Sequence, residues 1–427
     1  MSSQLAAPRG TRDVVPPESL LWQRIEQVCR DRFDRYGFRE IRTPAFEGTE
    51  LFTRGIGEAT DIVSKEMYTF VDRGDRSLTL RPEGTAGVVR AYLQNKLATS
   101  LPHPAKLWYG GAMFRYERPQ AGRQRQFHQI GVELLGSADP MADAEVITLA
   151  LDVFKALDVG GLRVELNSLG DETCRPLYRE RLVAFFVERR ADYCETCLER
   201  METNPLRVLD CKVPACKAVN AEAPSLQDVL CDDCRQHQAT LLRYLAAVNI
   251  RTVLNPRLVR GLDYYTRTVF EIVAESGLGS QDTVCAGGRY DHLVEECGGP
   301  PTPAVGWAFG EERLAILLAN QMPAIKTDLV IATMGPSAAE AGFKLAHDLR
   351  QALPLRIETG YGDRKLKKQL EHAERLGAEW VIVLGEDELA AGAIALKHLP
   401  TRQEQRVPMS VEGVSGAIAR ASGVAAG

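Results

Sequence analysis

Short strand-like segments, with one long interruption, constrain the fold of this chain more than any other feature. Between residues 67 and 310 the strand-like segments are MYTFVD, SLTLRPE, AKLWYGGAMFRYE, RQFHQIGVELLG, RVELNSLG, RTVFEIVAE and TPAVGWAFG. Segments with apolar residues at helical spacing lie between several of them, for example residues 87–97 and 142–157. This order predicts an α+β fold with a mostly antiparallel sheet flanked by helices.

The N-terminal segment predicts a helix followed by an extended stretch. Residues 19–36 carry apolar side chains at helical spacing, and Gly37 ends the pattern. In the following FREIRTPAFEGTELF, Pro44 breaks a strand-like alternation. Because proline cannot donate a ladder hydrogen bond, this stretch is typical of a sheet edge or an interface.

The strand series is interrupted once and then changes character. Residues 171–253 are rich in Arg, Glu and Cys and follow helical patterns, which predicts a mainly helical insertion. After Pro323, strand-like and helical segments alternate, which predicts a separate α/β domain. We therefore expect the catalytic part of any enzyme in residues 1–170 and 254–325, a cysteine-rich insertion in 171–253 and a C-terminal domain in 326–427.

Composition narrows the function classes. The 427 residues are 45% hydrophobic and 26% charged, which excludes a disordered or fibrous chain. No apolar run is long enough to span a membrane, and MSSQLAAPRGTRD lacks the apolar stretch of a secretory signal, so we expect a cytoplasmic protein with no membrane partner. The net charge of -5 argues against a broadly basic RNA-binding surface and leaves room for a local positive site.

The densest candidate site is the segment RYERPQAGRQRQFHQIGVE. Within eleven residues it carries Arg115, Glu117, Arg118, Arg123 and Arg125. A proline and a glycine between the arginines predict a loop between two strands. Guanidinium groups bind phosphates through two parallel hydrogen bonds, so the segment suits a nucleotide polyphosphate or RNA. By spacing alone, a solvated hairpin tip stays equally open.

Four more segments combine polar side chains with glycine or tyrosine, namely RGLDYYTRTVFEI, AGGRYDHLV, AVGWAFGEERL and LRPEGTAG. A Gly-Gly turn at residues 287–288 would allow close backbone approach to a ligand, and Gly306 and Gly310 would let a strand run beneath a flat ligand. Each segment also has a structural interpretation: core packing of the tyrosines, ordinary turns, and capping of a helix by Thr85.

Taken together and in this order, the segments resemble the class II aminoacyl-tRNA synthetases, and specifically the histidyl-tRNA synthetase family. The stretch through Pro44 resembles motif 1, FRYERP through RQF resembles motif 2, and GWAFGEERL resembles motif 3. RGLDYYTRTVFEI and AGGRYDHLV look like the histidine-specific peptides of that family. With PRGTRDVVPPE and LRPEGTAG the resemblance covers residues 8–323, and the C-terminal domain resembles an anticodon-binding domain.

The resemblance implies a ligase that activates L-histidine with ATP and Mg²⁺ to histidyl-adenylate and pyrophosphate, and then transfers histidine to the 3′ end of tRNA(His). It also implies a homodimer formed through the Pro44 region. By the same resemblance the catalytic residues are Arg115 and Arg260, which would clamp the α-phosphate. The ATP-binding residues are Arg115, Glu117, Arg123 and Arg313.

The resemblance further assigns the two remaining substrates. The histidine-binding residues are Glu83, Thr85, Gln129, Glu133, Arg260, Tyr264 and Tyr265. Of these, Glu133 and Tyr264 would contact the imidazole, which suits a ring with one donor and one acceptor when neutral. The tRNA-binding residues are Arg118, Arg123, Arg125, Lys365, Lys367 and Lys368.

The cysteines suggest a metal site, because cytosolic thiols stay reduced. Cys194 and Cys197 form one CxxC pair and Cys231 and Cys234 form a second, and two such pairs can complete a tetrahedral zinc site. Two further cysteines between the pairs leave the ligand set open, and core packing remains the alternative. Four cysteines stand singly and are predicted to be core or incidental, namely Cys29, Cys174, Cys285 and Cys297.

Three other functions stay open at this stage. The first is a regulatory subunit of the first enzyme of histidine biosynthesis, which keeps this fold without the chemistry. The second is a class II synthetase for threonine, proline or glycine, and the third is an RNA-binding protein without catalysis. The arginines and the full C-terminal domain argue against the first, and RGLDYYTRT argues against the second.

Overall fold

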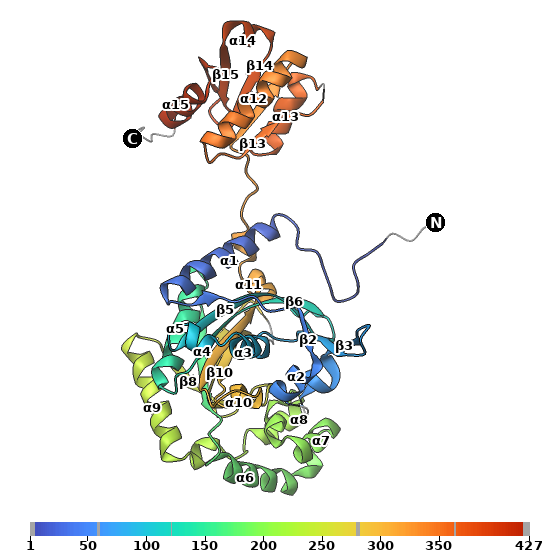
Figure 1. Ribbon diagram of the computed structural model, residues 1–427, viewed down its shortest axis with the longest axis vertical. Helices are drawn as coiled ribbons and strands as arrows, with labels where there is room; N and C mark the ends of the chain where they lie inside the picture. The colour runs from blue at the N-terminus through green and yellow to red at the C-terminus, as the bar shows by residue number, and fades with distance from the viewer. Residues whose placement is uncertain (1–4, 58–59, 121, 279–281, 363, 422–427) are drawn as a thin grey trace. The chain divides into compact units, whose positions relative to one another are not determined.

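The computed structural model describes residues 5–57, 60–120, 122–278, 282–362 and 364–421. The chain divides into two compact units, one ending at Met322 and the other beginning at Pro323 (Figure 1). Among the described residues, no helix combines the length and the apolar character that crossing a membrane requires.

An eight-stranded sheet organises the described part of the larger unit, in the order β1-β5-β6-β11-β10-β9-β7-β8. Neighbouring strands are antiparallel except for the two edge pairs, β1 with β5 and β7 with β8. The strands are β1 (Arg39–Glu40), β5 (Ala105–Phe114), β6 (Gln126–Leu135), β7 (Leu162–Ser168), β8 (Thr252–Leu254), β9 (Thr266–Ala274), β10 (Thr283–Arg289) and β11 (Ala304–Gly310). The short β1 lies at the sheet edge, as expected for the stretch that leads to Pro44.

A small antiparallel sheet and helices surround the main sheet. The small sheet contains β2 (Phe46–Gly48), β3 (Tyr68–Val71) and β4 (Ser77–Leu80) in the order β2-β4-β3. The helices are α1 (Glu18–Arg35), α2 (Thr49–Ile56), α3 (Thr85–Gln94), α4 (Leu97–Ser100), α5 (Pro140–Ala156), α10 (Leu293–Glu296) and α11 (Glu311–Leu317), with a π-helical turn at Ile62–Glu66 and a 3-10 turn at Ala319–Gln321.

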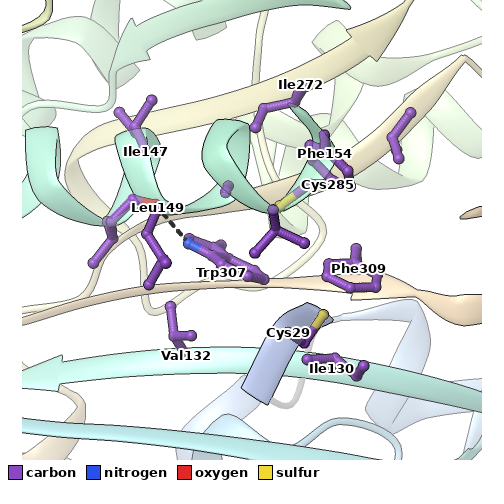
Figure 2. Packing of buried hydrophobic residues seen from close by; sticks show 14 of the residues in the cluster. Cys29, Ile130, Val132, Ile147, Leu149, Phe154, Ile272, Cys285, Trp307 and Phe309 are labelled. Carbon is purple, nitrogen blue, oxygen red and sulfur yellow. Dashed lines mark hydrogen bonds between the residues drawn. The ribbon is translucent and has the colours of Figure 1, made fainter. Parts of the chain in front are cut away.

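Each face of the main sheet has its own apolar core because strand side chains alternate between faces. On one face, residues of α1 and α5 pack over the central strands (Figure 2). Residues of α9 (Asp232–Ala247) belong to the same core. The Trp307 ring lies in this core, and its Nε1 donates to the Val146 carbonyl at 2.7 Å. Cys29 and Cys285 are buried in the same core, as predicted for single cysteines. The opposite face packs against α3 and α10.

The segment AGGRYDHLV is not the turn that its two glycines suggest. Gly287 and Gly288 lie inside strand β10, paired with β11 on one side and β9 on the other. Arg289, at the end of β10, is fully buried and forms an ion pair with Asp143 of α5, and its Nη1 donates to the Ser137 carbonyl at 2.8 Å. Its charge is therefore used inside the fold, because a buried guanidinium needs a buried partner.

Between β7 and β8 the described chain is helical and has a core of its own. Its helices are α6 (Arg175–Glu188), α7 (Glu195–Thr203), α8 (Pro214–Asn220) and α9 (Asp232–Ala247), with 3-10 turns at Arg190–Asp192, Pro205–Asp210 and Leu226–Val229. Tyr178, Leu182 and Phe186 of α6 are buried in this core together with several cysteines.

The C-terminal unit is a five-stranded sheet with helices, in the order β13-β12-β14-β15-β16. Its strands are β12 (Leu329–Thr333), β13 (Ile357–Thr359), β14 (Trp380–Leu384), β15 (Ala393–His398) and β16 (Gln403–Pro408). Its helices are α12 (Pro336–Ala352), α13 (Leu366–Arg375), α14 (Glu386–Ala391) and α15 (Val411–Ala421). The first three strands in sheet order are parallel, as expected for alternating strands and helices, and β15 and β16 add an antiparallel edge.

Candidate active site

Small residues line one face at the centre of the main sheet. In β11, Gly306, Ala308 and Gly310 alternate with the core residues of the opposite face. The strand register pairs Ala308 with Ala286 of β10 on one side and with Gly131 of β6 on the other. Ala286, Ala308 and Gly310 are only partly buried, although the residues next to them in the two strands, such as Cys285, Trp307 and Phe309, are buried. The sheet therefore offers a shallow floor without large side chains.

A buried carboxyl group lies at one end of this floor. Glu133 of β6 is 1% exposed, and its Oε1 accepts a 2.7 Å hydrogen bond from the Thr85 hydroxyl. Its Oε2 accepts from the Tyr290 hydroxyl. Gly306 lies opposite Glu133 in the register, and a Cβ at Gly306 would lie 1.9 Å from Glu133 Oε2. The missing side chain of Gly306 thus provides the space for this carboxyl group.

Burial raises the pKa of Glu133 to about 8, although the donors Tyr290 and Thr85 act in the opposite direction. Water solvates a carboxylate better than this site does, so desolvation outweighs the hydrogen bonds. Near neutral pH the site therefore holds a carboxyl group that can either donate or accept a proton. Such a group suits a ligand that itself titrates near pH 7.

Glu83 and Thr85 form the support of this carboxyl group. Both oxygens of Glu83 accept from the first backbone N–H groups of α3, those of Thr85 at 2.6 Å and Ala86 at 2.8 Å. The alternative that Thr85 caps this helix is wrong, because Glu83 is the acceptor and the Thr85 hydroxyl donates to Glu133. Burial raises the pKa of Glu83, with the two N–H donors opposing the shift.

Three tyrosines enclose the same end of the floor. Tyr264 and Tyr265 are each 6% exposed, and their ring centroids lie 4.7 Å apart. The Tyr264 ring also meets the Tyr290 ring edge-on, with centroids 5.5 Å apart. Sequence reasoning missed Tyr290 as a site residue because AGGRYDHLV was interpreted as a turn. Its position after a strand that carries two glycines was the available signal.

A chain of polar contacts crosses from β9 to the start of α11. Arg260 Nη1 donates to Glu271 Oε1 at 2.5 Å, and Glu271 Oε2 accepts from the Thr283 hydroxyl at 2.8 Å. The Thr283 carbonyl in turn accepts from Arg313 Nη1 at 2.7 Å. The register pairs Glu271 with Ala286, so this chain runs beside the open part of the floor. Glu271, which the sequence did not single out, thus positions one of the expected catalytic arginines.

The arginine-rich segment forms the end of the β5-β6 hairpin and the loop that joins the two strands. Arg115 is mostly buried, and its Nε donates to the Pro82 carbonyl at 2.8 Å. The Glu117 carboxylate lies 3.8 Å from Arg115 Nη1 and 3.2 Å from Arg123 Nη1. A Cβ at Gly122 would lie 3.1 Å from Cγ of Arg313, so the loop packs against α11. The structure therefore brings Arg115, Glu117, Arg123 and Arg313 to one region.

Gln129 and Arg260 carry buried polar atoms without a partner in the part of the chain that the structure describes. Gln129 Oε1 lacks a donor and Arg260 Nε lacks an acceptor. Gln129 lies four residues before Glu133 on β6, which places both on the same face of the sheet. Buried polar atoms are normally hydrogen-bonded, so these two are candidate contacts for a bound molecule.

The remaining predicted residues lie at the surface. Arg118 and Arg123 are exposed on the hairpin loop, and the Arg125 guanidinium stacks 3.9 Å from the centre of the Tyr116 ring. Lys365, Lys367 and Lys368 are exposed at the start of α13 in the C-terminal unit.

The structure groups the cysteines differently from the expected zinc site. Cys194 and Cys197 lie with Cys211 and Cys216, whereas Cys231 and Cys234 lie with Cys174 and Asp171. The prediction that both CxxC pairs form one zinc site is therefore wrong. Each pair converges with two other residues, and the two pairs lie in different groups. Cys174, predicted to be core or incidental, is buried and belongs to the second group.

Comparison with known proteins identifies the family. Residues 10–314 match the family described as "Histidyl-tRNA synthetase", and residues 328–418 match "Anticodon binding domain". The chain belongs to the histidyl-tRNA synthetase family. The class II synthetase fold, with its antiparallel sheet and C-terminal α/β domain, and the activity of a histidine–tRNA ligase are thereby confirmed.

Individual relatives match this chain over nearly its full length and over nearly their own. A "Histidine--tRNA ligase" from Thermosynechococcus vestitus is 52% identical over 406 residues, which are 95% of this chain and 94% of the relative. The apo histidyl-tRNA synthetase of S. aureus superposes with a TM-score of 0.81 at 36% identity and covers 95% of this chain and 98% of its own.

The synthetases for other amino acids, which the sequence left open, are excluded by family membership. A third structure, an "ATP phosphoribosyltransferase regulatory subunit/histidyl-tRNA synthetase" from Bacillus halodurans C, has a TM-score of 0.63 over 90% of this chain and 99% of its own. At 19% identity it shows a common fold alone.

Proposed function

We propose that this chain binds histidine with its imidazole at the buried Glu133 and its carboxylate toward Arg260, with ATP over the floor of small residues. One observation carries the proposal: a buried carboxyl group held by Thr85 and Tyr290 lies at the closed end of a floor whose open side is bordered by arginines.

Glu133 and Tyr264 contact the imidazole ring. With a pKa of about 8, the carboxyl group is mostly protonated near neutral pH, where a free imidazole is mostly neutral. The carboxyl group and the imidazole then share one proton. They can form either a neutral pair or a carboxylate–imidazolium pair, and the total number of protons is the same in both. Tyr290 positions Glu133, and Tyr265 packs beside Tyr264. A ring that lacks both a donor and an acceptor leaves these buried groups unpaired, which a hydrogen-bonding site rejects strongly.

The ends of the amino acid meet the atoms that lack protein partners. Gln129 Oε1 is a suitable acceptor for the α-ammonium group, and Arg260 Nε is a suitable donor to the carboxylate. Glu83 and Thr85 complete the ammonium site through lone pairs that their contacts with α3 and Glu133 leave free. Glu271 fixes the Arg260 guanidinium, so little reorganisation is needed when the substrate binds.

Adenylation then follows from the positions of the arginines. The histidine carboxylate attacks the α-phosphorus of ATP, the bond to the β-phosphate breaks, and pyrophosphate leaves. Arg115 and Arg260 stabilise the negative charge that develops on the α-phosphate. Arg313 and Arg123 bind the outer phosphates, where Mg²⁺ enters as part of the ATP substrate, and Glu117 accepts from the adenine amino group. In the second step the terminal ribose hydroxyl of tRNA attacks the carbonyl, and AMP leaves.

The tRNA contacts involve both units. Arg118, Arg123 and Arg125 contact the acceptor end, and residues 326–427 act as the anticodon-binding domain. Lys365, Lys367 and Lys368 stand at the N-terminus of α13, where lysines oppose the helix dipole and therefore gain from a bound phosphate. Residues 1–170 and 254–325 form the catalytic domain in this scheme, and residues 171–253 form its insertion.

The protein acts in the cytoplasm as a homodimer through the region that follows Pro44. Phe46 is 50% exposed and Val71 is 65% exposed on the small sheet, and Phe70 lies against Phe46 with ring centroids 6.3 Å apart. An apolar cluster of this kind is typical of a surface that a partner covers. Sedimentation analysis tests this assignment, since Phe46→Ser should shift the protein toward the monomer.

Amino-acid-dependent exchange of labelled pyrophosphate into ATP, measured with each of the twenty amino acids and without tRNA, tests the proposal. Exchange with histidine alone is the expected result. Exchange with another amino acid would contradict the assignment of the Glu133 pocket. Absence of exchange would contradict the assignment of the arginines.

A further inference from the structure

The helical segment between β7 and β8 contains two groups of four converging metal-ligand side chains outside the candidate active site. One group is Cys194, Cys197, Cys211 and Cys216, and the other is Asp171, Cys174, Cys231 and Cys234. Within each group all four ligand atoms lie within 4.8 Å of one another. The two CxxC pairs of the sequence thus each acquire two partners that are distant in the chain.

The sulfur separations fit a shared metal ion. Cys194 Sγ and Cys211 Sγ are 3.9 Å apart, and Cys174 Sγ and Cys234 Sγ are 3.8 Å apart. Tetrahedral zinc with Zn–S bonds of about 2.3 Å separates its ligand atoms by about 3.8 Å. A disulfide requires about 2.05 Å between sulfurs, roughly half the observed separation. The small size of both groups suits one ion and not a multi-iron cluster.

Core packing does not explain the first group, because its side chains converge on one another. Cys197 and Cys216 are at most 1% exposed, and the Cys194 N–H donates to Cys216 Sγ at 3.2 Å. Cys194 and Cys197 stand at the start of α7, Cys211 ends a 3-10 turn, and Cys216 lies in the first turn of α8. Four sulfurs from three turns are the typical ligand set of a structural zinc site.

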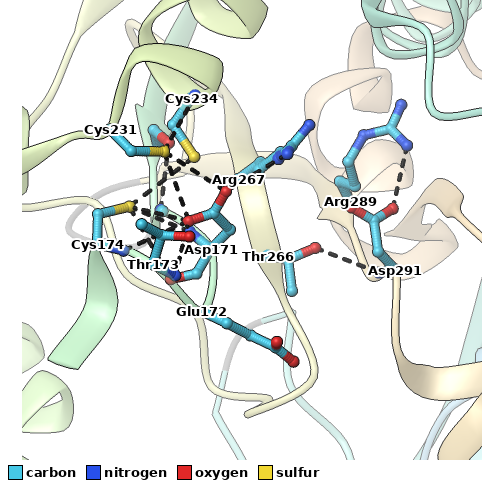
Figure 3. A network of polar contacts seen from close by, with 12 residues as sticks. Asp171, Glu172, Thr173, Cys174, Cys231, Cys234, Thr266, Arg267, Arg289 and Asp291 are labelled. Atoms are coloured by element: carbon cyan, nitrogen blue, oxygen red, sulfur yellow. Dashed lines mark hydrogen bonds and ion pairs between the residues drawn. The ribbon is translucent and has the colours of Figure 1, made fainter.

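The second group joins α9 to the end of β7 (Figure 3). Cys231 precedes α9 and Cys234 lies in its first turn, while Asp171 and Cys174 precede α6. Three thiolates and one carboxylate form a ligand set that zinc accepts, and soft thiolates favour zinc over magnesium or calcium.

The second group also reaches the histidine pocket. Asp171 Oδ2 lies 3.4 Å from Arg267 Nη2. Backbone hydrogen bonds join the same segments, from Arg267 N to the Gly170 carbonyl at 2.8 Å and from Leu169 N to the Arg267 carbonyl at 2.7 Å. Arg267 follows Tyr265 by two residues, and the Tyr265 carbonyl accepts from Arg175 Nη1 at 3.3 Å. Residues of the second group and its neighbours are therefore in contact with strand β9, which begins directly after the tyrosines.

We propose that each group binds one Zn²⁺, so that the protein carries two structural zinc ions per chain. The Cys194 group holds α7 and α8 together inside the insertion. The Asp171 group fastens α6 and α9 to the catalytic sheet next to the histidine pocket. Both are structural sites, because four protein ligands leave no open position for a substrate.

Metal analysis of the full-length protein, purified without chelator from zinc-supplemented medium, is the first test. About two equivalents of zinc per chain are expected, with no disulfide detected by mass analysis of the intact protein. One equivalent or none overturns the two-site proposal, as does iron in place of zinc. Disulfides within the groups also overturn it.

Single substitutions separate the two sites. Cys216→Ser should lower the zinc content to about one equivalent and leave the KM for histidine within about twofold. Cys231→Ser should also leave about one equivalent and should raise the KM for histidine several-fold, since it loosens the contact with β9. Cys297→Ser is the matched control and should retain both ions, because Cys297 belongs to neither group. Equal zinc content in all three variants would contradict the ligand assignment.

Cobalt substitution keeps the test independent of whether the variants fold. Wild-type protein produced with Co²⁺ should show thiolate-to-cobalt charge-transfer bands and two sets of d–d bands, one for four sulfur ligands and one for three sulfurs with an oxygen. Absence of the charge-transfer bands would show that the thiols do not bind the metal and would overturn the proposal.

Discussion

Replacing Glu133 with Gln should make the protein more stable at alkaline pH while it removes histidine activation. Burial raises the pKa of Glu133 from 4.5 to about 8, so the folded chain retains a proton that the unfolded chain releases. Stability therefore falls as the pH rises between these two values. At about 1.4 kcal/mol per pKa unit, the raised pKa of Glu133 lowers the free energy of unfolding by about 2 kcal/mol at about pH 6 and by about 4 kcal/mol at about pH 8.

Glutamine does not titrate, so the stability difference between Glu133→Gln and wild type should grow by about 2 kcal/mol between these pH values. Changes in the hydrogen bonds with Thr85 and Tyr290 are present at both pH values and cancel in this comparison. For a unit that ends at Met322, the difference corresponds to about 3 °C in the Tm.

Scanning calorimetry of wild type and Glu133→Gln at both pH values measures this shift, with Glu180→Gln, an exposed glutamate on α6, as the matched control. The control should follow wild type at both pH values. A Tm difference for Glu133→Gln that is the same at both pH values would refute the raised pKa. Histidine-dependent pyrophosphate exchange should fall at least about 10-fold in Glu133→Gln, because the amide cannot share a proton with the imidazole.

Four further outcomes follow from the same contacts. Tyr290→Phe removes a donor to Glu133 and should raise the KM for histidine about 10-fold to 100-fold with little change in the KM for ATP, as steady-state exchange assays would show. Arg260→His should lower pyrophosphate exchange about 100-fold to 1000-fold while circular dichroism stays unchanged; a rate near that of wild type would contradict the clamp. Arg313→Ala should raise the KM for ATP and leave that for histidine unchanged, which titration of each substrate separates. The KM for histidine of wild type should rise above about pH 8, where Glu133 loses its proton, and a KM independent of pH would contradict the shared proton.

The sequence was sufficient where a periodic pattern determines the element. Residues 19–36 predicted α1 to within one residue at either end, and the alternation in RQFHQIGVELLG and TPAVGWAFG predicted β6 and β11. The order of these strands in the sheet could not be predicted, because β11 pairs with β6 across a long stretch of chain. In β10 the two glycines hid the alternation. Glycine is needed at both positions, because a Cβ atom there would overlap with the neighbouring strands or with Tyr265.

The candidate site was predictable in its residue types and less so in its contacts. Resemblance pointed to Glu133 and Arg260, but their partners Tyr290 and Glu271 depend on strand register, which one sequence does not determine. The cysteines show the same limit. CxxC spacing indicated ligand pairs, yet Asp171 and Cys174 join the second pair only because the end of β7 folds against the start of α9.

Strand β11 contributes to both faces of the sheet, with Val305, Trp307 and Phe309 in the core and Gly306, Ala308 and Gly310 on the face that carries the proposed substrate floor. Overpacking a core commonly displaces the backbone. Because both faces of β11 share one backbone, a core substitution that displaces the strand also displaces the floor. A genetic screen for loss of aminoacylation should therefore recover substitutions in the hydrophobic interior of β11 as readily as substitutions at the arginines.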